Sequence, residues 1–129
     1  MNGEGSQAAF TTSEARGILR ASWIVHEFRS AGHRLTANNI AAFLAVANSP
    51  DLGPTEYAKL LGTMQPVASR WLLDLGPKGR EGSEGMGLLE REPDLMNLRQ
   101  VRYCLSDRGI TLARRVGAIA MGRESFTDI

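Results

Sequence analysis

The 129-residue sequence contains one cysteine, Cys104, so it forms no internal disulfide and offers no pair of thiolates to a zinc ion. Its apolar runs fall short of the roughly 20 residues that cross a bilayer. The first six residues lack the basic and apolar segments of a signal peptide. Neither sign of charge dominates, because 15 Lys and Arg residues face 14 Asp and Glu residues. These absences predict one soluble domain in the cytoplasm, with no membrane partner.

Residues suited to catalysis or metal binding are also scarce. His26 and His33 are too few for a metal site without carboxylate ligands, and no set of nucleophile, base and acid is recognisable. We therefore expect a protein that is not an enzyme and that binds no metal and no cofactor. The net charge of +1 neither favours nor excludes nucleic acid, because locally placed arginines, or a small patch doubled in a dimer, would supply a phosphate-binding surface.

Apolar residues recur at helical spacing near both ends of the chain, over about residues 13–31 and 107–121. In both segments they cover more than one side, and a helix of that kind needs more cover than one stripe of its own domain provides. We therefore predict that the two terminal helices pair with their mates in a second subunit. The residues expected at that contact are Ile18, Trp23, Ile24, Phe28, Leu112, Val116 and Ile119.

Three shorter helices are predicted between the two ends. Thr36 suits the N-cap of a helix over residues 37–48, and Pro54 suits the first turn of a short helix that ends at Gly62. A further helix follows over about residues 65–75. Two short helices joined by a tight, glycine-containing turn are typical of a helix-turn-helix. A plain helical hairpin in a bundle is the alternative, and the segment that follows decides against it.

Two short strands are predicted over residues 88–92 and 99–105, joined by residues 93–98. In the second strand Val101, Tyr103 and Leu105 alternate with Arg102 and Cys104, which is the period of a half-buried strand. A hairpin directly after a helix-turn-helix is a wing. The sequence thus predicts a mainly α fold with a small β-hairpin wing, an α+β winged helix-turn-helix with N- and C-terminal dimerisation helices. The glycine-rich stretch at residues 76–87 is expected to be a flexible surface loop.

From Leu35 to about Ala113, the order of these motifs resembles that of the MarR-type winged-helix regulators. Residues 56–62 look like the first helix of the motif, and residues 65–75 look like its recognition helix. Gly87-Leu88-Leu89-Glu90-Arg91 resembles the start of the family's wing, and Leu105-Ser106-Asp107-Arg108-Gly109 resembles the motif that opens the closing helix. Three features depart from the family: Met64 replaces a small polar cap, residues 76–87 form an insertion, and Arg99 is the wing's one arginine at the basic positions.

The resemblance implies a homodimer that binds double-stranded DNA. In a helix-turn-helix, the start of the second helix enters the major groove, where Gln can bind adenine and Arg can bind guanine. Other candidates are a thymine-methyl contact at Pro66 and phosphate contacts near Thr55, on the flexible loop and at the wing. The DNA-binding residues expected are Thr55, Gln65, Pro66, Ser69, Arg70, Arg99, Lys78 and Arg80.

The resemblance also implies a domain organisation. We expect an N-terminal tail over residues 1–11, one domain over residues 12–122 and a C-terminal tail over residues 123–129. Within the domain, residues 35–105 would form the DNA-binding lobe, and residues 13–32 and 107–122 the dimerisation helices. A small-molecule effector is a further partner that the resemblance implies, in a pocket near Trp23 and Phe28, although ordinary core packing explains these residues as well.

The sequence therefore favours a homodimeric, sequence-specific transcriptional regulator, most simply a repressor. The alternative is a winged-helix module that binds a protein partner and binds DNA weakly or not at all. This alternative is favoured by residues 66–108, where cations and anions cancel, because duplex affinity depends on phosphate neutralisation. A third hypothesis is a thiol sensor at Cys104, for which a structural role in a strand is the preferred interpretation.

Overall fold

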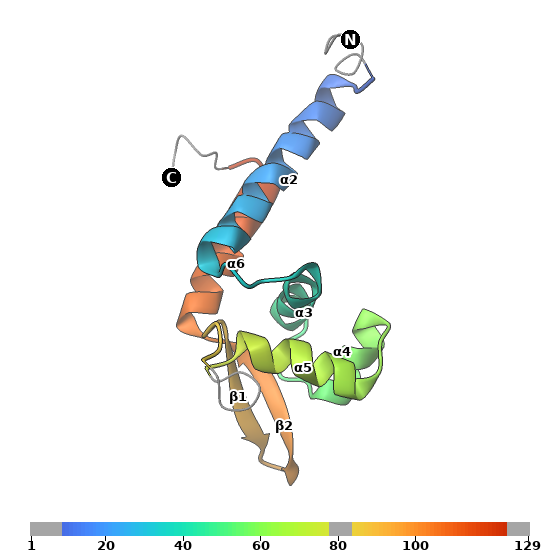
Figure 1. Cartoon of the computed structure of the whole chain (residues 1–129), viewed down its shortest axis with the longest axis vertical. Helices are drawn as coiled ribbons and strands as arrows, with labels where there is room; N and C mark the ends of the chain where they lie inside the picture. Colours follow the sequence, from blue (N-terminus) through green and yellow to red (C-terminus); the bar gives the residue numbers. More distant parts are fainter. Residues whose placement is uncertain (1–8, 78–83, 124–129) are drawn as a thin grey trace.

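The structure is a computed structural model that describes residues 9–77 and 84–123, with the backbone alone at Leu98 and Arg99. Its elements are α2 (Thr12–Ala31), α3 (Ala37–Asn48), α4 (Pro54–Leu61), α5 (Gln65–Leu75), β1 (Leu89–Asp94), β2 (Asn97–Leu105) and α6 (Asp107–Ala120). The molecule is elongated: α2 and α6 run side by side at one end, while α3, α4, α5 and the hairpin gather at the other (Figure 1). The winged helix-turn-helix fold predicted from the sequence is confirmed.

Local hydrogen bonds explain where the helices begin. The Thr11 hydroxyl accepts the Glu14 N–H at 3.0 Å, and the Glu14 carboxylate accepts the Thr11 N–H at 2.9 Å. Thr36 and Asn39 repeat this reciprocal cap at the start of α3. Ser106 caps α6 by accepting the Gly109 N–H at 3.0 Å. Each cap satisfies backbone donors that the first turn of a helix leaves without a partner.

The core lies where α3 meets α2, α5, α6 and the hairpin. Phe28 of α2 and Phe43 of α3 make an edge-to-face contact, with ring centroids 5.6 Å apart. The buried residues that form one continuous cluster are Phe28, Ala42, Phe43, Val46, Tyr57, Leu72, Leu75, Leu88, Leu89, Tyr103, Leu112 and Val116. One cluster thus ties the recognition helix, the hairpin and both long helices together.

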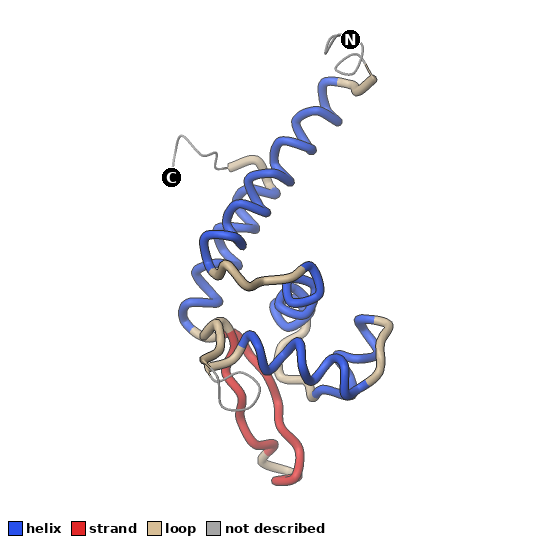
Figure 2. The backbone as a smooth tube through the Cα atoms, viewed as in Figure 1, coloured by secondary structure: helices blue, strands red, loops and turns tan. Residues whose placement is uncertain are grey.

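The hairpin is longer than the sequence predicted. Strand β1 runs to Asp94 and β2 begins at Asn97, so Leu95 and Met96 form the turn in place of the six-residue connection expected. Pro93, expected in the connection, lies within β1. A proline is tolerated at the edge of a sheet or at an irregularity, and the register shifts between Pro93 and Asp94. The hairpin therefore projects well beyond the helices (Figure 2).

A clasp of hydrogen bonds joins the end of α5 to both long helices. The N–H groups of Met86, Gly87 and Leu88 bond to the carbonyls of Asp74, Gly76 and Leu75, at 3.0, 2.9 and 2.8 Å. Arg108 at the start of α6 donates to the carbonyls of Met86 and Ala31, the last residue of α2. Gly109 passes so close to Leu88 that a Cβ there would lie 2.1 Å from the Leu88 carbonyl oxygen. This contact explains the glycine of the motif that opens the closing helix.

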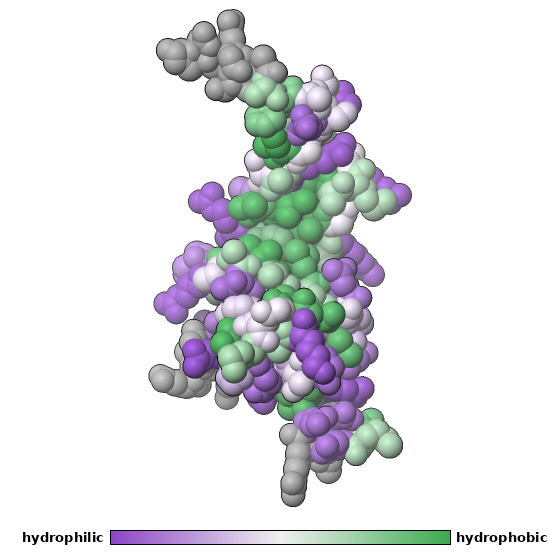
Figure 3. Space-filling model, turned by 90° about the vertical axis from the view of Figure 1, so that its right-hand side faces the viewer, coloured by the Kyte–Doolittle hydropathy of each residue, from purple (hydrophilic) through white to green (hydrophobic). Residues whose placement is uncertain are grey.

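The pair of long helices presents an apolar face. Ile18, Leu19 and Val25 of α2 are each about half exposed, at 49%, 49% and 50%. Apolar side chains form a band over this end of the molecule, flanked by polar ones (Figure 3). The first turns of α2 project beyond the end of α6 (Figure 1). No helix within the described ranges has the length and apolar character needed to cross a membrane.

The seven residues expected at a subunit contact lie in different environments. Ile18 is exposed, and Trp23 and Ile24 are half-buried. The other four are buried within the chain itself: Phe28, Leu112, Val116 and Ile119 are between 0% and 8% exposed. Their apolar surface is covered because α2 and α6 pack on each other. A contact with a second subunit would therefore involve Ile18 and its exposed neighbours rather than these four.

Candidate nucleic-acid interface

The turn between α4 and α5 sets the direction of the recognition helix. Gly62 ends α4 in the left-handed conformation, at φ 67° and ψ 35°, which a glycine adopts without steric penalty. The Thr63 N–H then bonds to the Ala58 carbonyl at 2.9 Å. Ala68 and Leu72 bury one face of α5. Arg70, on the opposite face, and Gln65, at the start of the helix, are exposed to solvent.

Met64 is the N-cap of α5. As the sequence predicted, it provides no side-chain cap: in the described structure the first turn is closed only by backbone bonds, from the Val67 and Ala68 N–H groups to the Met64 carbonyl at 3.0 Å. The Met64 side chain is 72% exposed. The recognition helix therefore begins with an apolar side chain in solvent.

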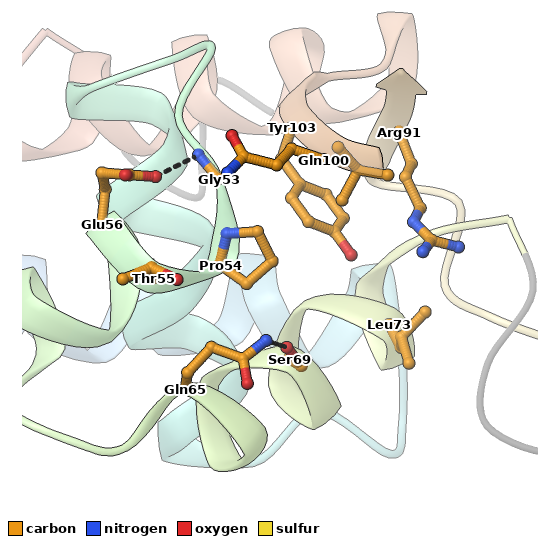
Figure 4. Close-up of a pocket in the computed structure, with 11 residues that line it drawn as sticks. Gly53, Pro54, Thr55, Glu56, Gln65, Ser69, Leu73, Arg91, Gln100 and Tyr103 are labelled. Carbon is orange, nitrogen blue, oxygen red and sulfur yellow. Dashed lines mark hydrogen bonds between the residues drawn. The ribbon is translucent and has the colours of Figure 1, made fainter. Parts of the chain in front are cut away.

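A groove of about 300 Å³ lies between the helix-turn-helix and the root of the wing. Its walls come from α4 (Thr55), α5 (Gln65 and Ser69), β1 (Arg91) and β2 (Gln100), as Figure 4 shows. Polar side chains that lie far apart in the sequence thus meet along one concave surface.

Gln65 and Ser69 are held in place within this groove. The Gln65 Nε2 donates to the Ser69 Oγ at 2.9 Å, one helical turn away (Figure 4). The bond leaves the Gln65 carbonyl oxygen and one amide hydrogen for other partners. At the α4 wall, the Gly53 N–H donates to the Glu56 carboxylate at 2.9 Å. That carboxylate brings negative charge next to Thr55, which weakens Thr55 as a phosphate contact.

Arg91 is a groove residue that the sequence analysis missed, as is Gln100. Arg91 lies opposite Tyr103 in the hairpin register and is exposed, so its guanidinium can face a ligand. Burial raises the pKa of the Tyr103 phenol, and the positive charge of Arg91 nearby partly opposes this rise. Arg91 lies two residues after the buried Leu89, and residues two apart share one face of a strand; this spacing is the signal that would have placed Arg91 on this face.

The other predicted DNA-binding residues are not all in the groove. Pro66 and Arg70 are exposed on α5 but do not line it. The structure gives the backbone of Arg99, in β2, and not its side chain. Lys78 and Arg80 lie outside the described residues. The structure therefore brings Thr55, Gln65 and Ser69 together, and the roles of all eight residues stay predictions.

The face of the wing opposite Arg91 is acidic. One ligand atom from each of Glu90, Glu92 and Cys104 lies within 4.8 Å of the others. Burial is the main reason that the pKa of the Cys104 thiol is raised, and Glu90, Glu92 and Asp51 raise it further, whereas Arg102 lowers it. A thiol with a raised pKa is mostly protonated at neutral pH and reacts slowly. This environment favours the structural interpretation of Cys104 over the thiol sensor.

A second cavity, of about 340 Å³, lies at the base of the helix pair. Its lining includes Ala31 and Leu112 together with the charged groups of Glu27, Arg108 and Arg115. Arg115 of α6 binds Glu27 of α2 through two bonds of 2.8 and 3.0 Å. The hydrogen bond from Arg115 lowers the pKa of the Glu27 carboxyl, although burial opposes this. Phe28, for which an effector pocket and ordinary core packing were both considered, is part of the core.

No known protein-family profile matches the sequence, and no curated protein matches it. The fold, in contrast, is similar to that of several solved structures. A protein designated RV1404 from Mycobacterium tuberculosis has a TM-score of 0.64 at 19% identity, over 91% of this chain and 72% of that one. A MarR family transcription regulator has a TM-score of 0.61 at 22% identity, over 93% and 70% of the two chains. MepR of S. aureus, solved as a DNA complex, has a TM-score of 0.62 at 19% identity, over 84% and 78%. The chain therefore has the MarR-type winged-helix fold.

Proposed function

We propose that the protein is a sequence-specific DNA-binding transcriptional regulator, a homodimeric repressor that recognises an inverted repeat. In this proposal the start of α5 enters the major groove, and the hairpin reaches the neighbouring minor groove. Each protomer recognises one half-site, and the two half-sites lie about one helical turn apart. Occupation of such a site blocks transcription of the gene that it overlaps.

The observation that carries the proposal is the groove between α5 and the wing. Gln65 and Ser69 are joined by a hydrogen bond of 2.9 Å, so the entropy of ordering Gln65 is partly lost before any ligand binds. A glutamine amide in the major groove suits adenine, and an exposed arginine such as Arg70 suits guanine. Arg91, on the other wall of the protein groove, supplies a cation for the phosphates of the bound duplex.

Similar proteins support the same function. MepR and Streptococcus pneumoniae FabT, whose folds this chain shares, were both solved in complex with DNA. In this chain the candidate base-binding residues lie at the start of α5, the part of a helix-turn-helix that reaches base edges.

Dimerisation is proposed because the exposed face of α2 is apolar. In a single chain Ile18, Leu19 and Val25 each stay about half exposed to water. A large apolar patch on the surface of a soluble protein usually marks an interaction site. A two-fold dimer also doubles the number of cations that face the duplex. The charges of the wing nearly cancel in one protomer, so one copy should bind weakly, and the second copy adds an equal set of base and phosphate contacts.

Selection from a random duplex pool tests the proposal. The purified protein is incubated with the pool at low and at near-physiological salt, beside an Arg70→Ala variant. We expect enrichment of an inverted repeat with the wild type and loss of that enrichment with the variant, since an arginine that binds a base is worth about 1–3 kcal/mol of discrimination. An Arg114→Ala variant, which removes a charge from exposed α6 surface, is the matched control and should enrich the same repeat.

Two outcomes of the selection would contradict parts of the proposal. If the wild type enriches no repeat at either salt concentration, sequence-specific DNA binding is refuted. The protein-interaction module then becomes the preferred function, and the exposed surface of α5 becomes the place to look for a partner. If Arg70→Ala and Arg114→Ala enrich the same repeat equally well, the protein binds DNA but Arg70 does not determine its specificity.

A further inference from the structure

The turn of the wing carries two large apolar side chains that touch almost nothing. Leu95 is 81% exposed and Met96 is 94% exposed, which makes them the two most exposed large apolar residues in the described part of the chain. They lie side by side in sequence at the end of the hairpin, which points away from the core (Figure 2). Apolar surface of this kind at a fixed point indicates a binding role that the core does not explain.

The backbone holds the turn in a defined shape. The Met96 N–H donates to the Asp94 carboxylate at 2.9 Å, and Asp94 pairs with Asn97 across the hairpin. Since the turn is closed by these contacts, Leu95 and Met96 are presented at the end of a supported hairpin.

The wing is long enough for its turn to reach the next groove of a bound duplex. Arg91 lines the groove beside α5, and Met96 follows it five positions later in the chain. At about 3.3 Å per residue this distance is roughly 16 Å, which exceeds the roughly 12 Å width of the major groove that would hold α5. The acidic Glu90 and Glu92 alternate with Arg91 and so lie on the opposite face of the hairpin.

We propose that Leu95 and Met96 form an apolar wedge that enters the minor groove beside the site of α5 and partly unstacks one base step there. This inference rests on the proposed function, because it requires a duplex bound along α5. Leucine and methionine are among the side chains that proteins insert between base steps, and such insertion kinks the duplex toward the major groove. Specificity at that step would come from the ease with which it unstacks, as at flexible pyrimidine–purine steps.

Fluorescence of 2-aminopurine tests the wedge, because this base analogue brightens when it leaves the stack. The probe is the duplex enriched by selection, with the adenines that flank each half-site replaced one at a time. We expect the wild type to raise the fluorescence at one flanking position of each half-site. A Leu95→Gln/Met96→Gln variant should abolish this rise and bind about tenfold more weakly, since two apolar side chains no longer leave water.

A second variant separates the apolar character of the turn from its exact side chains. Leu95→Met/Met96→Leu keeps both side chains apolar and should keep the fluorescence rise. Both variants change exposed residues, so both should melt as the wild type does. If the wild type binds the duplex with no rise at any position, or if the glutamine variant keeps the rise, the wedge is refuted while the proposed function stands.

Two further outcomes distinguish the wedge from other roles. If the glutamine variant becomes monomeric in sedimentation, the turn is a contact between subunits and the wedge is refuted. If the wild type enriches no duplex in the selection, the proposed function fails and the wedge fails with it.

Discussion

Replacement of Arg91 by alanine should reduce the dependence of DNA affinity on salt. Arg91 is exposed, lines the groove beside α5 and lies opposite Tyr103 in the hairpin. Each phosphate contact contributes about 0.9 to the slope of log K against log salt, because it releases condensed counterions. A dimer has two copies of Arg91, so the variant should lose about 1.8 from the magnitude of the slope.

This change in slope is large enough to measure. Between about 50 mM and about 200 mM salt, the logarithm of the salt concentration rises by about 0.6. A slope smaller by about 1.8 therefore changes log K by about 1 less, so the variant loses about tenfold less affinity over this range than the wild type does. Fluorescence anisotropy with the enriched duplex, at four or five salt concentrations, gives both slopes. Arg91→Lys keeps the charge and should keep the slope.

The control for Arg91 lies on the same hairpin. Arg102 alternates with Tyr103 in β2, so its side chain is on the other face, opposite Glu92 in the register. Arg102→Ala removes the same charge and should leave the slope nearly unchanged. The role given to Arg91 is refuted if Arg91→Ala has the wild-type slope, or if Arg102→Ala lowers the slope by an equal amount.

The other predictions concern stability, assembly and the thiol. Glu27→Gln should lower the free energy of unfolding by about 2 kcal/mol in urea titrations, because it leaves Arg115 without its carboxylate. The pKa of Glu27 is lowered from 4.5 in the fold, so the wild type should lose this contribution as the pH falls below 4.5, while the variant should not; equal acid profiles would contradict this. Ile18→Asp should weaken self-association at least about tenfold in sedimentation equilibrium. Ile119→Asp should instead unfold the chain, because Ile119 is 0% exposed. A monomeric wild type would exclude the dimer. The Cys104 thiol should react with Ellman's reagent more slowly at neutral pH in the folded than in the unfolded protein, and equal rates would show that burial does not protect it.

Helix ends could be predicted closely because they depend on neighbours in sequence. Thr36 caps α3 and Ser106 caps α6 through residues three positions later, and Gly62 ends α4 through its own left-handed backbone. The hairpin was harder to predict. Whether Pro93 ends a strand depends on the partner strand, and here an irregular register accommodates it at the edge.

Periodicity finds an apolar face but does not identify what covers it. Phe28 and Val116 are in the core because α2 and α6 of one chain pack together, whereas Ile18 lies beyond that contact and stays exposed. The same limit explains why Arg91 was missed as a groove residue. Its role depends on how the hairpin packs against α5, and the pairing of distant segments is not encoded in local spacing.

The clasp that follows α5 has a consequence for how this sequence can change. The backbone bonds from Met86, Gly87 and Leu88 close the chain on itself directly after Gly76, and the Gly85 N–H adds a bond of 3.2 Å to the Pro77 carbonyl. The two ends of the intervening stretch are thus fixed to each other, whatever lies between them. Doubling the length of such a loop adds only about 0.6 kcal/mol to its closure entropy. We therefore expect insertions and deletions between Pro77 and Gly85 to change the wing and α5 little, because the bonds that join the two ends lie outside that stretch.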